Sequence, residues 1–194
     1  MAATDQSLLF IHGFNSGPDG FKAVLLREHF REQGMEHRLH VPQLPIEPRA
    51  AMSRLEREIA GAGPVALVGS SLGGFYATWL AVHHDLPAVL INPVVQPWRL
   101  LADNVEEVAA ATGESVSAPD VENALRHYEV EDIPRPERML VLLQTGDEVL
   151  DWRDAADFYA DCSLYRQIGG SHGFDDFDAF IPLVLRFCGI TERP

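Results

Sequence analysis

Short apolar runs alternate with amphipathic stretches along most of the chain. Residues 7–13 and 64–70, for example, are continuously apolar in their middle and end in small or polar residues, as strands buried on both faces of a sheet do. The stretches that follow them space apolar residues three or four positions apart, which is typical of amphipathic helices. This alternation predicts an α/β fold with a mostly parallel central sheet of about six strands and helices on both faces.

The same pattern sets the expected bounds of the elements. Strands are expected over residues 7–13, 36–44, 64–70, 87–94 and 162–170. Another is expected within residues 138–149, where the apolar run MLVLLQ ends before Gly146 and Asp147. Helices are expected over residues 21–34, 48–63, 72–85, 152–161 and 174–189. Pro42 and Pro45 place the second strand at an edge of the sheet or mark its end, because proline cannot donate a hydrogen bond to a neighbouring strand. Pro182 predicts a kink in the final helix.

Residues 97–137 follow the pattern less regularly. They contain two expected helices, near residues 98–111 and 119–128. The length of 194 residues suits one domain. We therefore expect a single domain over residues 1–194, in which residues 97–137 form a short helical cap.

Composition and charge narrow the classes of partner. Hydrophobic residues make up 46% of the chain and charged residues 23%, as in ordinary globular proteins. The net charge of −14 argues against binding to nucleic acid or to an anionic membrane surface. No apolar run approaches the ~18 residues of a membrane span, and the N-terminus lacks the features of a signal peptide, so we expect a cytoplasmic protein. Cys162 and Cys188 show no metal-binding spacing.

A serine, a carboxylate and a histidine each follow a different expected strand. Ser71 follows residues 64–70, Asp147 follows the apolar run that begins at residue 138, and His172 follows residues 162–170. Chemistry in open α/β sheets collects at the carboxyl ends of the strands. The order Ser71, Asp147, His172 therefore suggests the nucleophile, acid and base of a catalytic triad.

Ser71 stands in the sequence Gly69-x-Ser71-x-Gly73, which is the pattern of a nucleophile elbow. A serine at this position turns sharply between a strand and a helix, in a backbone conformation that is costly for most residues. Side chains two positions before and after it would collide across so tight a turn, so glycine is expected at both. Ser71, and not Ser70, has glycine at both offsets. The alternative is an ordinary strand-to-helix turn.

His172 is the expected general base, since a serine hydroxyl is a poor nucleophile without one. It lies on a glycine-rich loop after the last expected strand. Asp147 is expected to orient the imidazole and to offset the charge that the ring gains. Glu148 and Asp151 are the alternatives. Asp147 is favoured because it is the first carboxylate after the strand, whereas Asp151 leads into a helix and suits its N-cap.

Two backbone N–H groups are expected to bind the oxyanion of the tetrahedral intermediate. Leu72 supplies one, as the residue after the nucleophile, and Phe14 in the loop after the first strand supplies the other. His12, in the same loop, is expected to form structural hydrogen bonds and not to act as an acid or base.

Five segments together resemble the α/β-hydrolase superfamily and, more narrowly, the small bacterial YqiA-like esterases. They are FIHGFNSGP, GSSLGGFYATWLA, LINPVVQP, QTGDEVLDWRDA and GGSHGF, and they are spread over nearly the whole chain in the family's order. The resemblance implies a compact α/β-hydrolase fold, a triad at Ser71, Asp147 and His172, oxyanion donors at Phe14 and Leu72, and no metal or cofactor. It also implies activity on short carboxylic esters.

These observations predict a serine esterase that acts on a small-molecule ester, with a preference for short to medium acyl groups because the expected cap is small. Val94, Trp98 and Phe174 are expected to line the substrate pocket together with Phe14. One alternative is a thioesterase or small-amide hydrolase with the same triad. Another is a non-catalytic receptor on a hydrolase fold. The sequence leaves the oligomeric state open.

Overall fold

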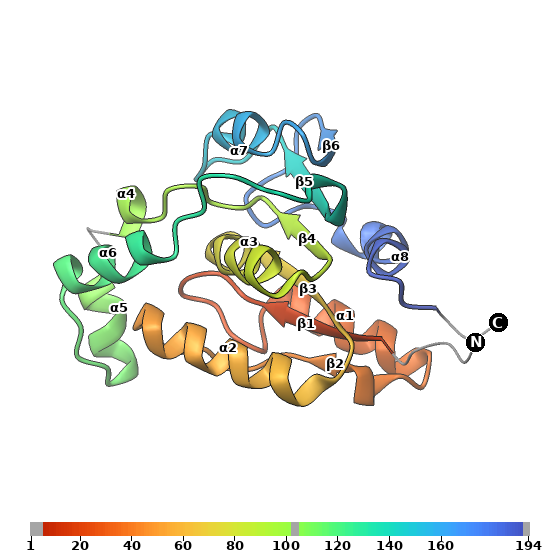
Figure 1. The fold of residues 1–194 in the computed structure, drawn as a ribbon, viewed down its shortest axis with the longest axis horizontal. Helices are drawn as coiled ribbons and strands as arrows, with labels where there is room; N and C mark the ends of the chain where they lie inside the picture. Colours follow the sequence, from red (N-terminus) through yellow and green to blue (C-terminus); the bar gives the residue numbers. More distant parts are fainter. Residues whose placement is uncertain (1–5, 102–104, 192–194) are drawn as a thin grey trace.

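One sheet of six strands crosses the middle of the molecule (Figure 1). The computed structural model describes residues 6–101 and 105–191. The strands are β1 (Ser7–Ile11), β2 (Leu39–His40), β3 (Val65–Ser70), β4 (Ala88–Ile91), β5 (Met139–Gln144) and β6 (Ser163–Gln167). They lie in the order β2-β1-β3-β4-β5-β6, and every neighbouring pair is parallel. The predicted α/β fold with its parallel sheet is confirmed.

Helices cover both faces of this sheet. They are α1 (Phe21–Glu32), α2 (Pro48–Ala62), α3 (Leu72–His84), α4 (Trp98–Leu101), α5 (Val105–Thr112), α6 (Ala118–His127), α7 (Trp152–Phe158) and α8 (Phe177–Phe187). Helices α2, α3 and α7 contribute to the buried cluster on one face, and α1 and α8 to the cluster on the other. Within the described ranges, no helix has the length and apolar character that crossing a membrane requires.

Successive residues of the central strands point to opposite faces of the sheet. In β1, Leu9 and Ile11 belong to the cluster that includes α2 and α3, whereas Leu8 and Phe10 belong to the cluster that includes α1 and α8. All four side chains are buried. Burial on both faces explains why these strands are continuously apolar in the sequence.

The chain reverses its direction across the sheet between β1 and β3. It runs from β1 outward to β2, then returns to β3 and continues through β4 and β5 to β6. Ligand sites of open α/β sheets lie at such a switch point, outside the carboxyl ends of the strands. The loops that leave β1 and β3 there carry His12, Gly13 and Ser71.

The described part of residues 97–137 contains the helical segments α4, α5 and α6. Segments α4 and α5 fall where one helix was expected near residues 98–111, of which residues 102–104 lie outside the described part of the chain. Helix α6 falls where the second helix was expected. Helix α6 packs against α4 and α2. Figure 1 shows α4, α5 and α6 grouped beyond the end of the sheet toward which the strand arrows point. Their role as a cap stays a prediction.

The final helix begins later than the sequence predicts. Helix α8 starts at Phe177, because Phe174 and Asp176 have φ angles of 65° and 58°, which a right-handed helix excludes. Pro182 lies inside α8, and the helix continues through it.

Candidate active site

Ser71 occupies a strained turn between β3 and α3. Its φ of 55° and ψ of −120° are costly for a residue with a side chain. Its N–H donates to the carbonyl oxygen of Ile91 at 3.0 Å, and its own carbonyl oxygen accepts from the N–H of Gly74 at 2.9 Å. These bonds tie the turn to β4 and to α3.

Glycine is required on both sides of this turn. A Cβ on Gly69 would overlap the backbone of Gly73, and a Cβ on Gly73 would overlap the carbonyl group of Ile11 at the end of β1. Gly13 lies close by, because a Cβ there would come within 3.2 Å of the Ser71 Cβ. The expectation that larger residues would collide across the turn is confirmed.

Three side chains from distant parts of the sequence form a chain of hydrogen bonds beside the turn. Nε2 of His172 lies 3.0 Å from the hydroxyl oxygen of Ser71. Nδ1 of His172 lies 2.8 Å from one carboxylate oxygen of Asp147 and 3.0 Å from the other. The Asp147 side chain is 1% exposed and the His172 side chain 22%. The fold thus brings together the three residues that the sequence singled out.

The carboxylate of Asp147 is fixed by its own loop. Its Oδ1 accepts two backbone N–H groups of the following turn, at 2.9 and 2.8 Å. The two alternative acids make other contacts. Glu148 accepts the backbone N–H of His172 at 3.0 Å, and Asp151 is the N-cap of α7, as the sequence suggested. Of these three acids, Asp147 is the one whose side chain contacts the imidazole.

Two buried amides, which sequence reasoning missed, hold the loop that carries His172. Gln144 Oε1 accepts the backbone N–H groups of Ser171 at 3.0 Å and Asp175 at 2.8 Å. Asn92 donates from Nδ2 to the Ser171 carbonyl oxygen at 3.0 Å, and its Oδ1 accepts the N–H of Gln144 at 3.0 Å. Each amide ends or follows an apolar strand, which is the sequence signal that could have revealed it.

The predicted oxyanion donors lie on the two loops beside Ser71. Leu72 is the first residue of α3, so its N–H has no acceptor within the helix. Phe14 follows Gly13, which packs against Ser71. Their assignment as oxyanion donors stays a prediction.

His12 is held as a neutral imidazole. Its Nε2 accepts the N–H of Leu44 at 3.2 Å, so the proton is on Nδ1, which donates to the Gly13 carbonyl oxygen at 2.9 Å. Burial lowers the pKa of His12, and the bond to Gly13 only partly opposes this. These contacts match the structural role expected from the sequence.

Two cavities meet at the loop after β1, and residues His12, Gly13 and Phe14 line both. The large cavity has a volume of about 750 Å³, and its lining includes Leu44, Leu72, Tyr76, Val108 and Glu114. The small cavity has a volume of about 260 Å³, and its lining includes Phe21, Lys22, Ser71, His172 and Gly173. The nucleophile and base therefore face the small cavity, and the large cavity opens beside them.

Phe174 lies in the core and lines neither cavity, which corrects its prediction as a pocket residue. It is fully buried on the α1 and α8 face, where its ring lies edge-on to those of Phe177 and Phe180. The apolar spacing of residues 174–187 suggested a helical position, but the positive φ of Phe174 places it in the loop before α8.

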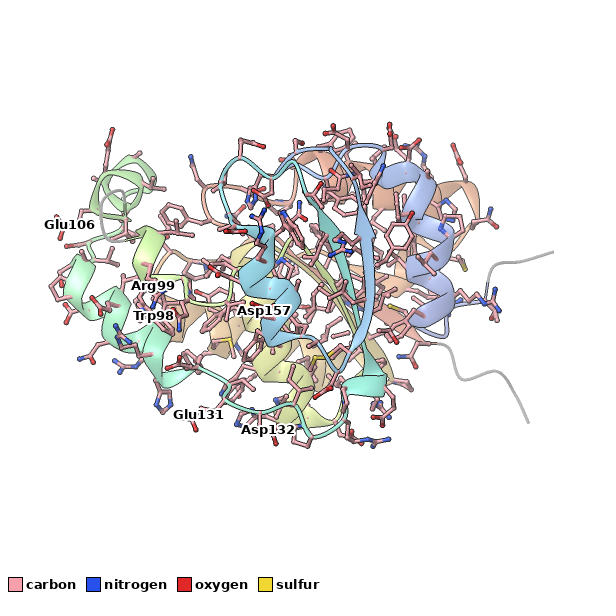
Figure 2. All side chains as sticks on the ribbon, turned by 90° about the horizontal axis from the view of Figure 1, so that it is seen from above. Trp98, Arg99, Glu106, Glu131, Asp132 and Asp157 are labelled. Atoms are coloured by element: carbon pink, nitrogen blue, oxygen red, sulfur yellow. The ribbon has the colours of Figure 1, made fainter. Side chains whose placement is uncertain are left out.

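Trp98 and Val94 also lie outside the lining of both cavities. Trp98, on α4 (Figure 2), packs edge-on against Phe75, and the guanidinium of Arg126 lies 4.5 Å from the centre of its ring. Val94 lines a separate groove of about 320 Å³, which it shares with residues at the start of α7. Of the predicted pocket residues, Phe14 is the one that faces the cavities.

Lys22, on the first turn of α1, lines the small cavity and was missed by sequence reasoning. Its Nζ donates to the Gly173 carbonyl oxygen at 2.6 Å. Burial lowers the pKa of Lys22 to about 8, although the negative charge of Asp147 acts in the opposite direction. Lys22 is the only lysine in the sequence, a signal that could have drawn attention to it.

In the part of the chain that the structure describes, no group of three or more His, Cys, Asp or Glu side chains is arranged to hold a metal ion. Cys162 and Cys188 are free thiols. Burial raises the pKa of the Cys188 thiol to about 12.

A family model described as an uncharacterised protein family, UPF0227, matches residues 7–189. The match spans all six strands and includes Ser71, Asp147 and His172. The chain belongs to UPF0227. This membership, together with the fold and the α/β-hydrolase structures described next, agrees with the resemblance to the α/β-hydrolase superfamily and to YqiA-like proteins.

Solved structures of low sequence identity share the fold. Mouse α/β hydrolase domain-containing protein 10 aligns with a TM-score of 0.64 over 94% of this chain and 86% of its own, at 18% identity. The ydeN gene product of B. subtilis aligns with a TM-score of 0.63 over 94% and 96%, at 16% identity. Est1E from Butyrivibrio proteoclasticus aligns with a TM-score of 0.62 over 95% and 88%, at 14% identity. At these identities the likeness shows the fold alone.

The packing of the turn predicts the effect of filling it. We expect Gly73→Ala to lower the free energy of unfolding by about 2 kcal/mol or more, because the added methyl group overlaps the Ile11 carbonyl and forces the backbone to shift. Gly61→Ala in α2 is the matched control, since nothing lies within 4 Å of an added Cβ there. We expect it to leave stability unchanged or to raise it by about 0.5–1 kcal/mol. Urea denaturation measures the free energy of unfolding of both variants. Equal denaturation midpoints for Gly73→Ala and Gly61→Ala would contradict the packing argument.

The position of Lys22 predicts its titration. Burial disfavours the ammonium, so we expect a midpoint of about 8 in the folded protein, against 10.5 for an ordinary lysine. Because the sequence has one lysine, reductive methylation with ¹³C-formaldehyde gives a single side-chain signal that NMR can follow with pH. Asp147→Asn is expected to lower the pKa of Lys22 further, since it removes a nearby negative charge. A midpoint near 10.5 in the folded protein would show that the ammonium is fully solvated.

Proposed function

We propose that this UPF0227 protein is a serine hydrolase that cleaves carboxylic esters through an acyl-enzyme on Ser71. The observation that carries the proposal is the hydrogen-bonded chain from Ser71 through His172 to the buried Asp147. A serine hydroxyl needs an adjacent base to become a strong nucleophile, and the base needs a partner that orients it. The likeness of fold also extends to the pyrethroid hydrolase PytH.

Acylation begins when the Ser71 hydroxyl oxygen attacks the carbonyl carbon of the ester. Nε2 of His172 takes the hydroxyl proton, while Asp147 holds the proton on Nδ1 and offsets the charge of the imidazolium. The tetrahedral intermediate then collapses and the bond to the leaving oxygen breaks. Nε2 gives its proton to the leaving alkoxide, and the acyl group stays on Ser71.

Deacylation repeats these steps with water as the nucleophile. His172 takes a proton from water as the water oxygen attacks the acyl carbon, then returns a proton to the Ser71 oxygen as the acid leaves. In both halves the N–H groups of Leu72 and Phe14 are proposed to donate to the oxyanion. The N-terminal end of α3, where Leu72 lies, adds a favourable dipole at the developing negative charge.

The large cavity supports a small-molecule substrate with a short to medium acyl group. Its volume of about 750 Å³ lies in the range of ligand pockets, and Val108 of α5 and Glu114 contribute to its lining. We propose that residues 97–137 act as the cap of a single domain over residues 1–194. In the same fold, Est1E has been seen with ferulic acid bound, which is a carboxylic acid like the product expected here.

Two alternatives keep the fold and change the chemistry. A thioesterase or small-amide hydrolase would use the same three residues, and the rates on an oxygen ester and its matched thioester or amide separate these cases. A non-catalytic receptor would have no need of the full hydrogen-bonded chain, which is why the hydrolase is preferred.

A covalent probe tests the nucleophile. We expect a fluorophosphonate to label the wild-type protein once, at Ser71. The Ser71 hydroxyl oxygen attacks the phosphorus atom and displaces fluoride, with His172 taking the proton as in acylation. Ser71→Ala should not be labelled, and Ser70→Ala should be labelled normally if it folds. Intact-protein mass spectrometry gives the readout. Absence of labelling in the wild type, or equal labelling of Ser71→Ala, would overturn the hydrolase proposal.

The choice of acid is tested by a matched pair. We expect Asp147→Asn to reduce kcat on an activated ester by a factor on the order of 10⁴, because the amide favours the wrong tautomer of His172. Asp151→Asn is the control, since asparagine can still cap α7 and the side chain does not contact the imidazole. A large loss in Asp151→Asn together with a small loss in Asp147→Asn would contradict the assignment.

A further inference from the structure

The composition of the small cavity sets it apart from the rest of the molecule. The chain contains 15 Lys and Arg residues, and Lys22 is the only lysine among them. Lys22 lines the cavity that also holds Ser71 and His172, in a protein whose net charge is −14. Of the residues placed by the structure, no arginine lines this cavity, and Lys22 is its single cationic side chain apart from any charge on the histidines.

Lys22 keeps hydrogen-bonding capacity free for a ligand. Its ammonium group has three N–H donors, and one of them donates to the Gly173 carbonyl oxygen at 2.6 Å. Among the residues that the structure describes, Lys22 forms no ion pair with a carboxylate. The charge of Asp147 acts on Lys22 and partly opposes the effect of burial on its pKa, but the Asp147 carboxylate is itself hydrogen-bonded to His172.

A purely structural role does not account for a charged residue here. The bond to Gly173 could be made by a neutral donor, without the free-energy cost of removing an ammonium from water. Lys22 is partly buried, and burial lowers its pKa to about 8. A bound anion would offset the cost, since a hydrogen bond to a charged group is stronger than one between neutral groups.

The position of His172 indicates which part of a bound ester would lie near Lys22. His172 protonates the leaving oxygen in the proposed mechanism, so the alcohol part of the ester lies on the side of His172 and Gly173, in the small cavity. The acyl part then extends past Leu72 and Phe14 into the large cavity. The small cavity, at about 260 Å³, has room for a short alcohol.

We propose that Lys22 binds a carboxylate on the alcohol part of the substrate, so that the preferred substrates are acyl esters of short hydroxy acids. A single ammonium matches one singly charged carboxylate, whereas a dianionic phosphate would call for more cationic donors than this cavity has. The inference rests on the proposed hydrolase function, and the experiment below distinguishes the failure of one from the failure of the other.

The test compares two esters that differ only in charge. Butanoyloxyacetate carries a carboxylate on its alcohol part, and butanoyloxyacetamide replaces it with a neutral amide. We expect wild-type protein to favour the carboxylate by about tenfold or more in kcat/KM, as measured by liberated butanoate. Lys22→Met and Lys22→Gln are expected to lose this preference, chiefly through KM for the carboxylate. Lys22→Gln retains a neutral hydrogen-bond donor for the Gly173 carbonyl oxygen. It gives the result of the test if Lys22→Met does not fold.

Arg31→Met is the matched control. It removes one positive charge from the same helix at an exposed position outside both cavities, so the preference should stay at the wild-type value. A preference that survives in both Lys22 variants would overturn the inference. Equal losses on the two esters would also overturn it, because they would assign Lys22 to holding the His172 loop.

Binding without turnover separates the two proposals. In wild-type protein labelled with ¹³C-lysine, Lys22 gives the single lysine side-chain signal and keeps its three N–H donors. Added glycolate should shift this signal to saturation, and glycolamide should not. If the fluorophosphonate labels Ser71 but glycolate leaves the signal unmoved, the carboxylate inference fails and the hydrolase stands. If glycolate shifts the signal but Ser71 is not labelled, the hydrolase proposal fails and the anion site stands.

Discussion

Direct backbone contact between the β3–α3 turn and the end of β1 is the constraint on which the site depends. There is no space for a side chain at Gly69 or Gly73. Because both residues are glycine, the turn can lie directly against the Ile11 carbonyl. This contact fixes Ser71 at the sheet edge in a conformation that would otherwise be costly. The favourable free energy that offsets the strain comes from β1 and β3, whose side chains are buried on both faces of the sheet.

The second requirement is that loops from separate strands keep their relative positions. Loops are usually the most variable part of a fold, and here buried amides restrain them. Gln144 and Asn92 bond to each other and to the loop that carries His172. A buried polar network with its donors and acceptors satisfied has fewer alternative arrangements than an apolar contact. The contacts of its loop therefore hold the imidazole between Ser71 and Asp147.

The site holds a cationic side chain in a protein that is strongly negative as a whole. The protein carries a net charge of −14, yet its only lysine lies beside the proposed nucleophile and base. Asp147 and Lys22 act on one another, since the carboxylate raises the pKa that burial lowers. The proposed active site is thus a local electrostatic environment that the overall composition does not describe.

The sequence by itself determined the parallel sheet, the elbow at Ser71 and the edge at which Ser71, Asp147 and His172 meet. These follow from local rules: burial on both faces demands continuous apolar strands, a tight turn demands glycine, and parallel strands end at one edge. Only the tertiary structure decided which acid faces the imidazole, that Phe174 belongs to the core, and that Lys22 lines the small cavity. Those outcomes depend on loop conformation and on contacts between residues far apart in the chain, which no local pattern of residues encodes.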